Sequence, residues 1–198
     1  MRAAGLAWVL ALAPCAALAG AQIEEQLADS VRAGLSAAVS DRAVPVLDFR
    51  DMEQGRLWLN EMSARLAKRI PDRARRTELL KTVHYEALRS RLDPQLVLGL
   101  MEIESAFRKY AVSSAGARGY MQVMPFWIKL VGKPDHNLFN LRTNLRYGCV
   151  ILRHYLDIEN GDYYRALGRY NGSLGRPEYP NLVLGAWRGR WGYTGATS

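Results

Sequence analysis

Two glutamates, Glu102 and Glu104, stand in an otherwise apolar stretch that begins after Asp93-Pro94. An aspartate can cap the free backbone N–H groups at the start of a helix, and proline suits the first helical position, so we expect a helix over 95–105. Its apolar composition predicts that this helix is buried, where a carboxylate is unfavourable unless it is solvated, paired or used in chemistry. Residues two positions apart point about 200° apart around a helix, so the two glutamates face opposite ways.

Glu104 shares its helix face with Val97, Leu100 and Met101. An apolar flank destabilises the carboxylate anion and raises its pKa. A glutamate that stays protonated near neutral pH is what a general acid needs in order to cleave a glycosidic bond. The spacing by itself leaves a structural alternative open, because a glutamate that ends a buried helix beside Ser105 could equally act as a cap.

Further motifs follow this glutamate in a fixed order. They are Glu104-Ser105-Ala106-Phe107, Ala111-Val112-Ser113, the segment 116–125 and Arg169-Tyr170-Asn171-Gly172. Together they resemble the catalytic region of the soluble lytic transglycosylases, which belong to the lysozyme-like superfamily and are close to goose-type lysozyme. The resemblance covers about residues 93–171, and it is specific because the blocks match in order and in spacing.

The resemblance implies an enzyme that cleaves the β-1,4 bond between N-acetylmuramic acid and N-acetylglucosamine in peptidoglycan glycan strands. Glu104 would protonate the bridging oxygen and then act as a base on the muramic acid C6 hydroxyl, which closes a 1,6-anhydro ring without water. A two-carboxylate glycosidase needs a second acid. Glu102 faces away, which fits a route assisted by the 2-acetamido group of the substrate.

By the same resemblance, the residues expected to bind substrate are Ser113, Gln122, Met124, Tyr170 and Asn171. Ser113 and Tyr170 would hydrogen-bond near the acetamido group or the catalytic acid. Gln122 and Met124 would line the sugar groove, and Asn171 would orient the region around Tyr170. No cofactor or metal is expected, since the three histidines lack ligand spacing with other His, Cys or carboxylate residues.

Two positions depart from the family pattern, Tyr120 where Leu is usual and Arg169 where Ala is usual. Neither removes a chemical group that the family uses, but both could alter the groove and so the substrate preference. Two alternative functions stay open. One is a goose-type lysozyme that cleaves the same bond with water, and the other is a non-catalytic peptidoglycan-binding protein.

The N-terminus has the layout of a secretory signal peptide. Met1-Arg2 gives a positive start, residues 3–19 are apolar, and Ala19-Gly20-Ala21 offers a cleavage site. We expect removal of residues 1–21 and a location in the periplasm or cell envelope; an uncleaved anchor or a lipid on Cys15 are the alternatives, so membrane association is left open. The formal net charge of +8 suits anionic envelope polymers, and export argues against a nucleic-acid partner.

Helical periodicity runs through most of the remaining chain. Hydrophobic residues recur every four positions over 23–39, and Leu57, Met62, Leu66 and Ile70 are candidate core positions of a helix over about 50–70. Further helices are expected over 73–91, 141–158, 162–170 and 177–187, with a loop or small β element over 108–119. We therefore predict a mainly α protein, in which a lysozyme-like catalytic domain over 76–198 carries an N-terminal helical extension over 22–75.

Overall fold

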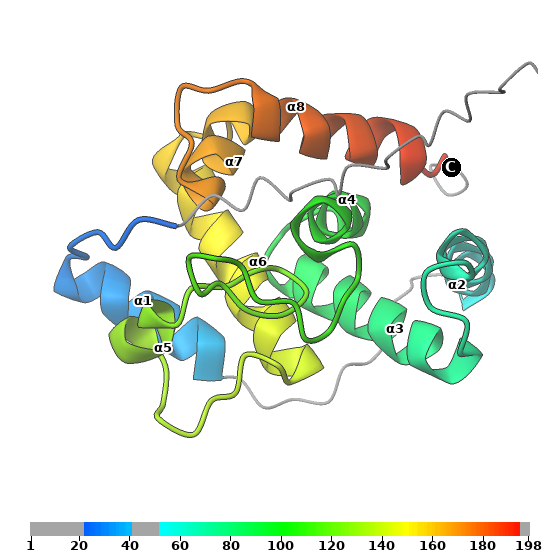
Figure 1. Cartoon of the computed structure of the whole chain (residues 1–198), viewed down its shortest axis with the longest axis horizontal. Coiled ribbons are helices and arrows are strands. Elements are labelled where there is room, and N and C mark those ends of the chain that lie inside the picture. The colour runs from blue at the N-terminus through cyan, green and yellow to red at the C-terminus, as the bar shows by residue number, and fades with distance from the viewer. Residues whose placement is uncertain (1–21, 41–51, 195–198) are drawn as a thin grey trace, which may run out of the picture.

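The structure, a computed structural model, describes residues 22–40 and 52–194 (Figure 1). The predicted signal peptide over residues 1–21 lies outside the described residues. The helices in chain order are α1 (Asp29–Ser40), α2 (Met52–Leu66), α3 (Arg73–Arg89), α4 (Pro94–Ser105), α5 (Phe126–Val131), α6 (Leu141–Ile158), α7 (Tyr163–Asn171), α8 (Glu178–Gly185) and the short π-helix η1 (Ala186–Arg190). The prediction of a mainly α fold is confirmed.

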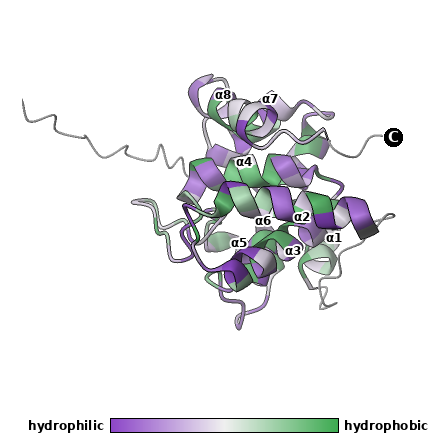
Figure 2. Ribbon diagram, turned by 90° about the vertical axis from the view of Figure 1, so that its right-hand side faces the viewer, coloured by the Kyte–Doolittle hydropathy of each residue, from purple (hydrophilic) through white to green (hydrophobic). Residues whose placement is uncertain are grey.

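Helix α4 lies at the centre of the molecule, where Figure 1 views it end-on. It contacts α3 on one side and α8 and η1 on another, while α6 contacts α1, α3 and α7. Figure 2 shows that α4, which lies among the other helices, is coloured mostly as hydrophobic. A buried ion pair between Glu86 of α3 and Arg146 of α6, with Nη2 and Oε1 2.9 Å apart, joins two of the surrounding helices.

The predicted start of α4 is confirmed in detail. The Asp93 carboxylate accepts a hydrogen bond from the Gln95 backbone N–H at 2.7 Å, and Pro94 takes the first helical position. The helix ends at Ser105, and Ala106, which caps it, has a φ of 49° in the left-handed region. Every residue from Leu96 to Met101 is buried. The predicted burial of this apolar helix is therefore confirmed.

The loop after α4 is a small β element, as expected. Residues Val112 and Arg118 form one isolated antiparallel bridge, and Arg118 and Val123 form a second. In Figure 1 this loop passes in front of α4 and lies between α4 and the α1–α5 pair. It therefore runs beside the helix end that carries Glu104.

The N-terminal half differs from the sequence expectation at two points. The periodic stretch that starts at Ile23 becomes helical only at Asp29, and Ile23 is 61% exposed. The segment before α1 is held instead by Gln22, whose buried side chain reaches α5. A second correction concerns Leu57, which is 48% exposed rather than a core residue.

The buried hydrophobic face of α2 includes Trp58, one residue after the Leu57 that the sequence analysis had placed in the core. Trp58, Met62 and Leu66 are all buried, and their spacing of four places them on a single face, towards α3. Leu57 precedes this face by one residue and so points outward. Helix α5 was not expected from the sequence, because its six residues are too few to show a periodic pattern.

None of the helices in the described ranges combines the length and the apolar character that crossing a bilayer requires.

Candidate active site

Glu104 lies in the last turn of α4 with its side chain in the core. The residue is 6% exposed, and burial raises the pKa of its carboxyl group from 4.5 to about 8. The Tyr179 hydroxyl donates a hydrogen bond to Oε1 at 2.5 Å, which lowers the pKa by a smaller amount. At neutral pH the group is therefore mostly the neutral acid, which is the protonation state that a proton donor needs.

Tyr179 lies at the start of α8 and is 2% exposed. Burial, together with the adjacent Glu104, raises the pKa of its hydroxyl well above 10.0, so Tyr179 stays neutral. A neutral tyrosine that donates to Oε1 leaves the acid proton of Glu104 on Oε2. The hydrogen bond therefore orients the carboxyl group and keeps its proton on the oxygen that Tyr179 does not occupy.

Glu102 faces the opposite side of α4, as the helical spacing predicts. Its carboxylate is paired with Arg69 and lies 3.0 Å from Arg190 Nε. Trp191 Nε1 donates a third hydrogen bond to Oε2 at 2.7 Å. Glu102 thus ties the turn after α2 and the end of η1 to α4, and its oxygens are not free to act as a second acid.

The loop beside Glu104 is held by side chains from three helices. Ser105, the residue after Glu104 in α4, donates a hydrogen bond from its Oγ to the Tyr120 carbonyl at 2.7 Å. Asn144 of α6 accepts from the Met121 backbone N–H at 2.8 Å, and the Tyr170 hydroxyl of α7 donates to the Met121 carbonyl at 2.8 Å. These hydrogen bonds fix two consecutive peptide groups against the end of α4.

Asn144 is a residue that the sequence analysis did not single out. Besides its bond to Met121, its Nδ2 donates to the carbonyls of Arg118 at 2.8 Å and Leu138 at 2.9 Å. Asn144 itself is 1% exposed, and its contacts with Met121 and Leu138 are buried. The Asn144 amide uses its acceptor and both donors in these hydrogen bonds. It therefore fixes the shape of the loop, because the loss of any one bond would leave a backbone group without a partner.

The residues predicted to bind substrate fall on the same loop and on α7. The Gln122 side chain is buried and donates to the carbonyls of Gly119 at 2.9 Å and Ala111 at 3.2 Å. Ser113 Oγ, half-buried, accepts from the Ala117 backbone N–H at 3.0 Å. Both side chains therefore hold the turns of the loop.

Met124 is half-buried beside α5, and its backbone N–H donates to Gln22 Oε1 at 3.1 Å. Asn171 is the buried last residue of α7, directly after Tyr170. The sequence analysis expected Tyr170 near the acid or the acetamido group, and in the structure its hydroxyl bonds to the loop backbone at Met121. Substrate contact by any of these five residues stays a prediction.

Tyr179 is the second residue of the site that the sequence analysis missed. It is separated from Glu104 by 75 positions and lies between Glu178 and Pro180, without a periodic or motif signal. Only the packing of α8 on α4 brings the two side chains together.

No group of three His, Cys, Asp or Glu side chains within residues 22–40 and 52–194 gathers so that it could hold a metal ion. The fold and the site thus define a helical protein with a buried carboxyl group, Glu104, whose raised pKa suits a proton donor, beside a loop whose backbone is held by hydrogen bonds from three helices.

A family model described as "Transglycosylase SLT domain" matches residues 81–179, which is half of the chain. The chain belongs to this family. The match includes Glu104 and ends at Tyr179, so both partners of the short hydrogen bond lie within it.

Curated relatives carry corresponding names. The chain is 36% identical over 130 residues to the membrane-bound lytic murein transglycosylase C of Actinobacillus pleuropneumoniae, an alignment that covers 61% of this chain and 34% of that protein. It is 32% identical over 111 residues to a transglycosylase of Enterobacteria phage PRD1, which covers 52% of this chain and 41% of the phage protein. This chain thus spans well under half the length of either relative.

Among solved structures, the lytic transglycosylase Slt of Pseudomonas aeruginosa aligns with 54% of this chain and 20% of that chain. The identity is 24% and the TM-score 0.44, a similarity too low to assign the fold by itself.

Proposed function

We propose that this protein is a peptidoglycan lytic transglycosylase that cleaves the β-1,4 bond between N-acetylmuramic acid and N-acetylglucosamine. The observation that carries the proposal is the buried Glu104 carboxyl group, whose pKa is raised to about 8 and which accepts a hydrogen bond from Tyr179. Membership of the transglycosylase family and the murein transglycosylase named among the relatives support the substrate.

In the proposed reaction, Glu104 passes its proton from Oε2 to the oxygen that bridges the two sugars, and the glycosidic bond breaks. The resulting glutamate then takes the proton of the muramic acid C6 hydroxyl. The C6 oxygen bonds to C1 of the same sugar, which gives a 1,6-anhydro ring and returns Glu104 to its protonated form. One residue thus serves first as acid and then as base, and no water is consumed.

The surroundings of Glu104 support a route with a single protein carboxyl group. A two-carboxylate glycosidase needs a second acid within reach of the sugar. Glu102 is bound to Arg69, Arg190 and Trp191 on the far side of α4. The 2-acetamido group of the substrate would then stabilise the positive charge that develops at C1.

We assign substrate binding to the loop and the end of α7, with Ser113, Gln122, Met124, Tyr170 and Asn171 as its residues. The hydrogen bonds of Gln122 and Tyr170 to the loop backbone favour a positioning role, in which they shape the surface that receives the sugars. We also infer export to the cell envelope, with residues 22–75 as a helical extension of a catalytic domain over 76–198. The word "membrane-bound" in the name of a relative supports an envelope location.

The proposal is tested by digesting purified sacculi and separating the soluble products by mass. We expect muropeptides that end in 1,6-anhydro-N-acetylmuramic acid, and no turnover by Glu104→Gln, which keeps the shape of the side chain but cannot donate an acid proton. Products with reducing muramic acid ends would instead identify a hydrolytic lysozyme. Binding of sacculi without any cleavage would identify a non-catalytic peptidoglycan-binding protein.

A further inference from the structure

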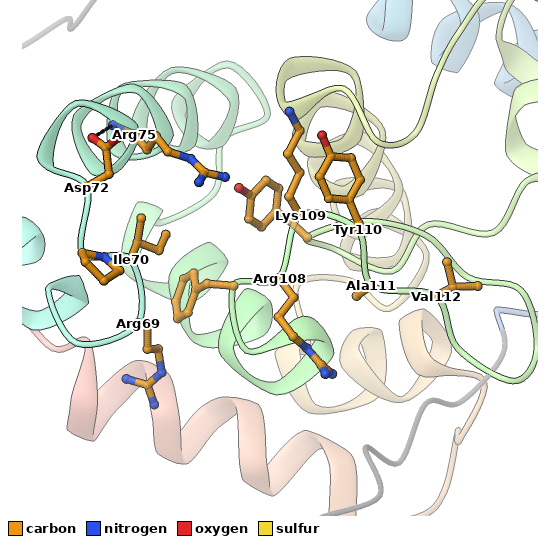
Figure 3. Close-up of a pocket in the computed structure, with 12 residues that line it drawn as sticks. Arg69, Ile70, Asp72, Arg75, Arg108, Lys109, Tyr110, Ala111 and Val112 are labelled. Atoms are coloured by element: carbon orange, nitrogen blue, oxygen red, sulfur yellow. Dashed lines mark hydrogen bonds between the residues drawn. The ribbon is translucent and has the colours of Figure 1, made fainter.

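A pocket of about 660 Å³ opens between the turn that joins α2 to α3 and the loop that follows α4 (Figure 3). We call it the basic pocket. Its wall includes Arg75 from α3 and Lys109, Tyr110 and Tyr120 from the loop. Glu104 is not among the residues that line it, so the basic pocket is separate from the acid of the proposed reaction.

The charge of the basic pocket is strongly one-sided. Arg69, Arg75, Arg108 and Lys109 line it, whereas Asp72 is its single acidic residue. Asp72 Oδ1 is used as the N-cap of α3, where it accepts hydrogen bonds from the backbone N–H groups of residues 74 and 75. The pocket therefore carries an excess of positive charge.

Two of the four cations have partners that draw them away from the pocket. Arg69 is paired with Glu102, and Arg108 Nε donates to the Ser105 carbonyl at 3.0 Å. Figure 3 shows both guanidinium groups pointing away from the side where Arg75 and Lys109 lie. Within the described residues, neither Arg75 nor Lys109 forms an ion pair with an acidic side chain.

Aromatic surface adjoins these two cations. Lys109 Nζ lies 5.2 Å from the centroid of the Tyr110 ring, and Tyr110 is 69% exposed. Phe107 and Tyr120 close the inner wall and are buried. A ligand that suits this surface carries carboxylate groups on a short chain with aliphatic parts, because the cations and the apolar ring faces lie side by side.

We propose that the basic pocket binds the carboxylate-bearing peptide stem of the glycan strand, which makes Arg75 and Lys109 determinants of substrate specificity. This inference rests on the proposed function. Glu104 and Arg108 are four residues apart, so their Cα atoms are separated by at most about 14 Å. A stem of four amino acids spans about the same length when extended, so it can reach from a sugar at Glu104 to the pocket.

A pocket with two cations that form no ion pair favours a small acidic peptide over larger anionic partners. Nucleic acid and lipid surfaces are bound through many cations spread over an open face. Here two cations, Arg75 and Lys109, line one pocket together with Phe107, Tyr110 and Tyr120. The stem peptide is the acidic ligand that the proposed substrate itself carries.

The test compares glycan strands that carry peptide stems with strands from which an amidase has removed them. The variant Arg75→Gln/Lys109→Gln neutralises the pocket, and Arg73→Gln/Lys81→Gln is the matched control. Both control positions lie on α3, are exposed and do not line the pocket. The two double variants therefore change net charge equally.

We expect the pocket variant to lose about tenfold in kcat/KM on peptide-bearing strands and nothing on stripped strands, while the control keeps wild-type values on both. An equal loss on both kinds of strand, or no loss on either, would overturn the proposal. So would unchanged cleavage together with lost binding to phosphatidylglycerol vesicles, which would show that the pocket serves a lipid.

A direct titration separates this proposal from the proposed function. The free tripeptide L-alanyl-γ-D-glutamyl-meso-diaminopimelate should bind the wild type and the control variant, and binding to the pocket variant should be at least tenfold weaker. If the wild type cleaves neither kind of strand but binds the tripeptide in this manner, the reaction assignment fails and the pocket stands. If the wild type, the control variant and the pocket variant bind the tripeptide equally well, the proposal that the basic pocket binds the peptide stem is wrong.

Discussion

Glu104 combines two properties that oppose each other, a position in the core and a titratable carboxyl group. Burial raises its pKa from 4.5 to about 8, so between these pH values the native protein holds a proton that the unfolded chain has lost. The free energy of unfolding therefore falls as the pH rises through this range, and the loss levels off above about pH 8. The site that can donate a proton is thus also a source of instability.

Glu104→Gln should remove this pH dependence, because an amide does not ionise. At pH 7 we expect the variant to be more stable than the wild type by about 3 kcal/mol, and near pH 4 the two should be similar. Urea unfolding at a series of pH values measures the difference. A gap that stays constant from pH 4 to pH 8 would show that Glu104 does not titrate as described.

Tyr179→Phe should move the titration of Glu104 to higher pH. The Tyr179 hydroxyl stabilises the anion, so its removal lets the burial effect act alone. We expect the alkaline limb of the profile of kcat/KM against pH to move to higher pH. We also expect kcat to fall about tenfold, because the carboxyl group of Glu104 is no longer oriented. The exposed Tyr164 is the control position, and Tyr164→Phe should leave the profile unchanged.

The same shift can be followed without substrate by titrating the Glu104 side chain in NMR spectra. An unchanged or lower pKa in Tyr179→Phe would contradict the role of the hydroxyl. A merely structural role for Tyr179 would change stability but not the position of the alkaline limb.

At the scale of elements, the loop after α4 is kept in place by the close approach of α6. Gly148 of α6 leaves room for Met121, since a Cβ atom on Gly148 would lie 2.7 Å from the Met121 Cβ. Met121 is also the residue whose backbone is bound by Asn144 and Tyr170. The absence of one side chain on α6 therefore allows the hydrogen bonds that position the loop.

Gly148→Ala should destabilise the protein by about 1–3 kcal/mol, because overpacking outweighs the gain in helix propensity. The control is Gly34→Ala in α1, where a Cβ atom would meet nothing within 4 Å. That variant should instead gain about 0.5–1 kcal/mol. Thermal unfolding of both variants provides the comparison, and stabilisation by both would contradict the contact at Met121.

At the scale of the whole molecule, the segment that precedes α1 is joined to the loop of the site. Gln22 Oε1 accepts hydrogen bonds from the Met124 backbone N–H at 3.1 Å and from Trp127 Nε1 at 3.0 Å. Glu25 adds an ion pair with Arg169 of α7, 3.3 Å between Oε1 and Nη1. The start of the described chain therefore helps to hold residues that lie more than a hundred positions later.

Gln22→Ala should lower the free energy of unfolding by about 2 kcal/mol, because the buried Trp127 Nε1 and the half-buried Met124 backbone N–H lose their acceptor. The neighbouring Ile23 is 61% exposed, and Ile23→Ala should change stability by no more than about 0.5 kcal/mol. Chemical denaturation of the two variants measures both values. Equal effects would mean that the segment before α1 makes no specific contact.

The sequence by itself determined the central helix and the opposite orientation of its two glutamates. Asp93 and Pro94 mark the start of α4, and a two-residue spacing sets Glu102 and Glu104 on opposite faces. Such signals act within one or two helical turns, so they can be read from neighbouring residues. The motif order also gave the family, which the match over residues 81–179 confirms.

Only the tertiary structure decided which groups meet Glu104 and its loop. Tyr179 reaches the acid from 75 residues away, and Asn144 and Gln22 reach the loop from other helices and from the segment before α1. These partners carry no local pattern, because a hydrogen bond between distant residues depends on how whole helices pack. The same packing sets the depth of burial, and burial is what raises the pKa of Glu104 to about 8.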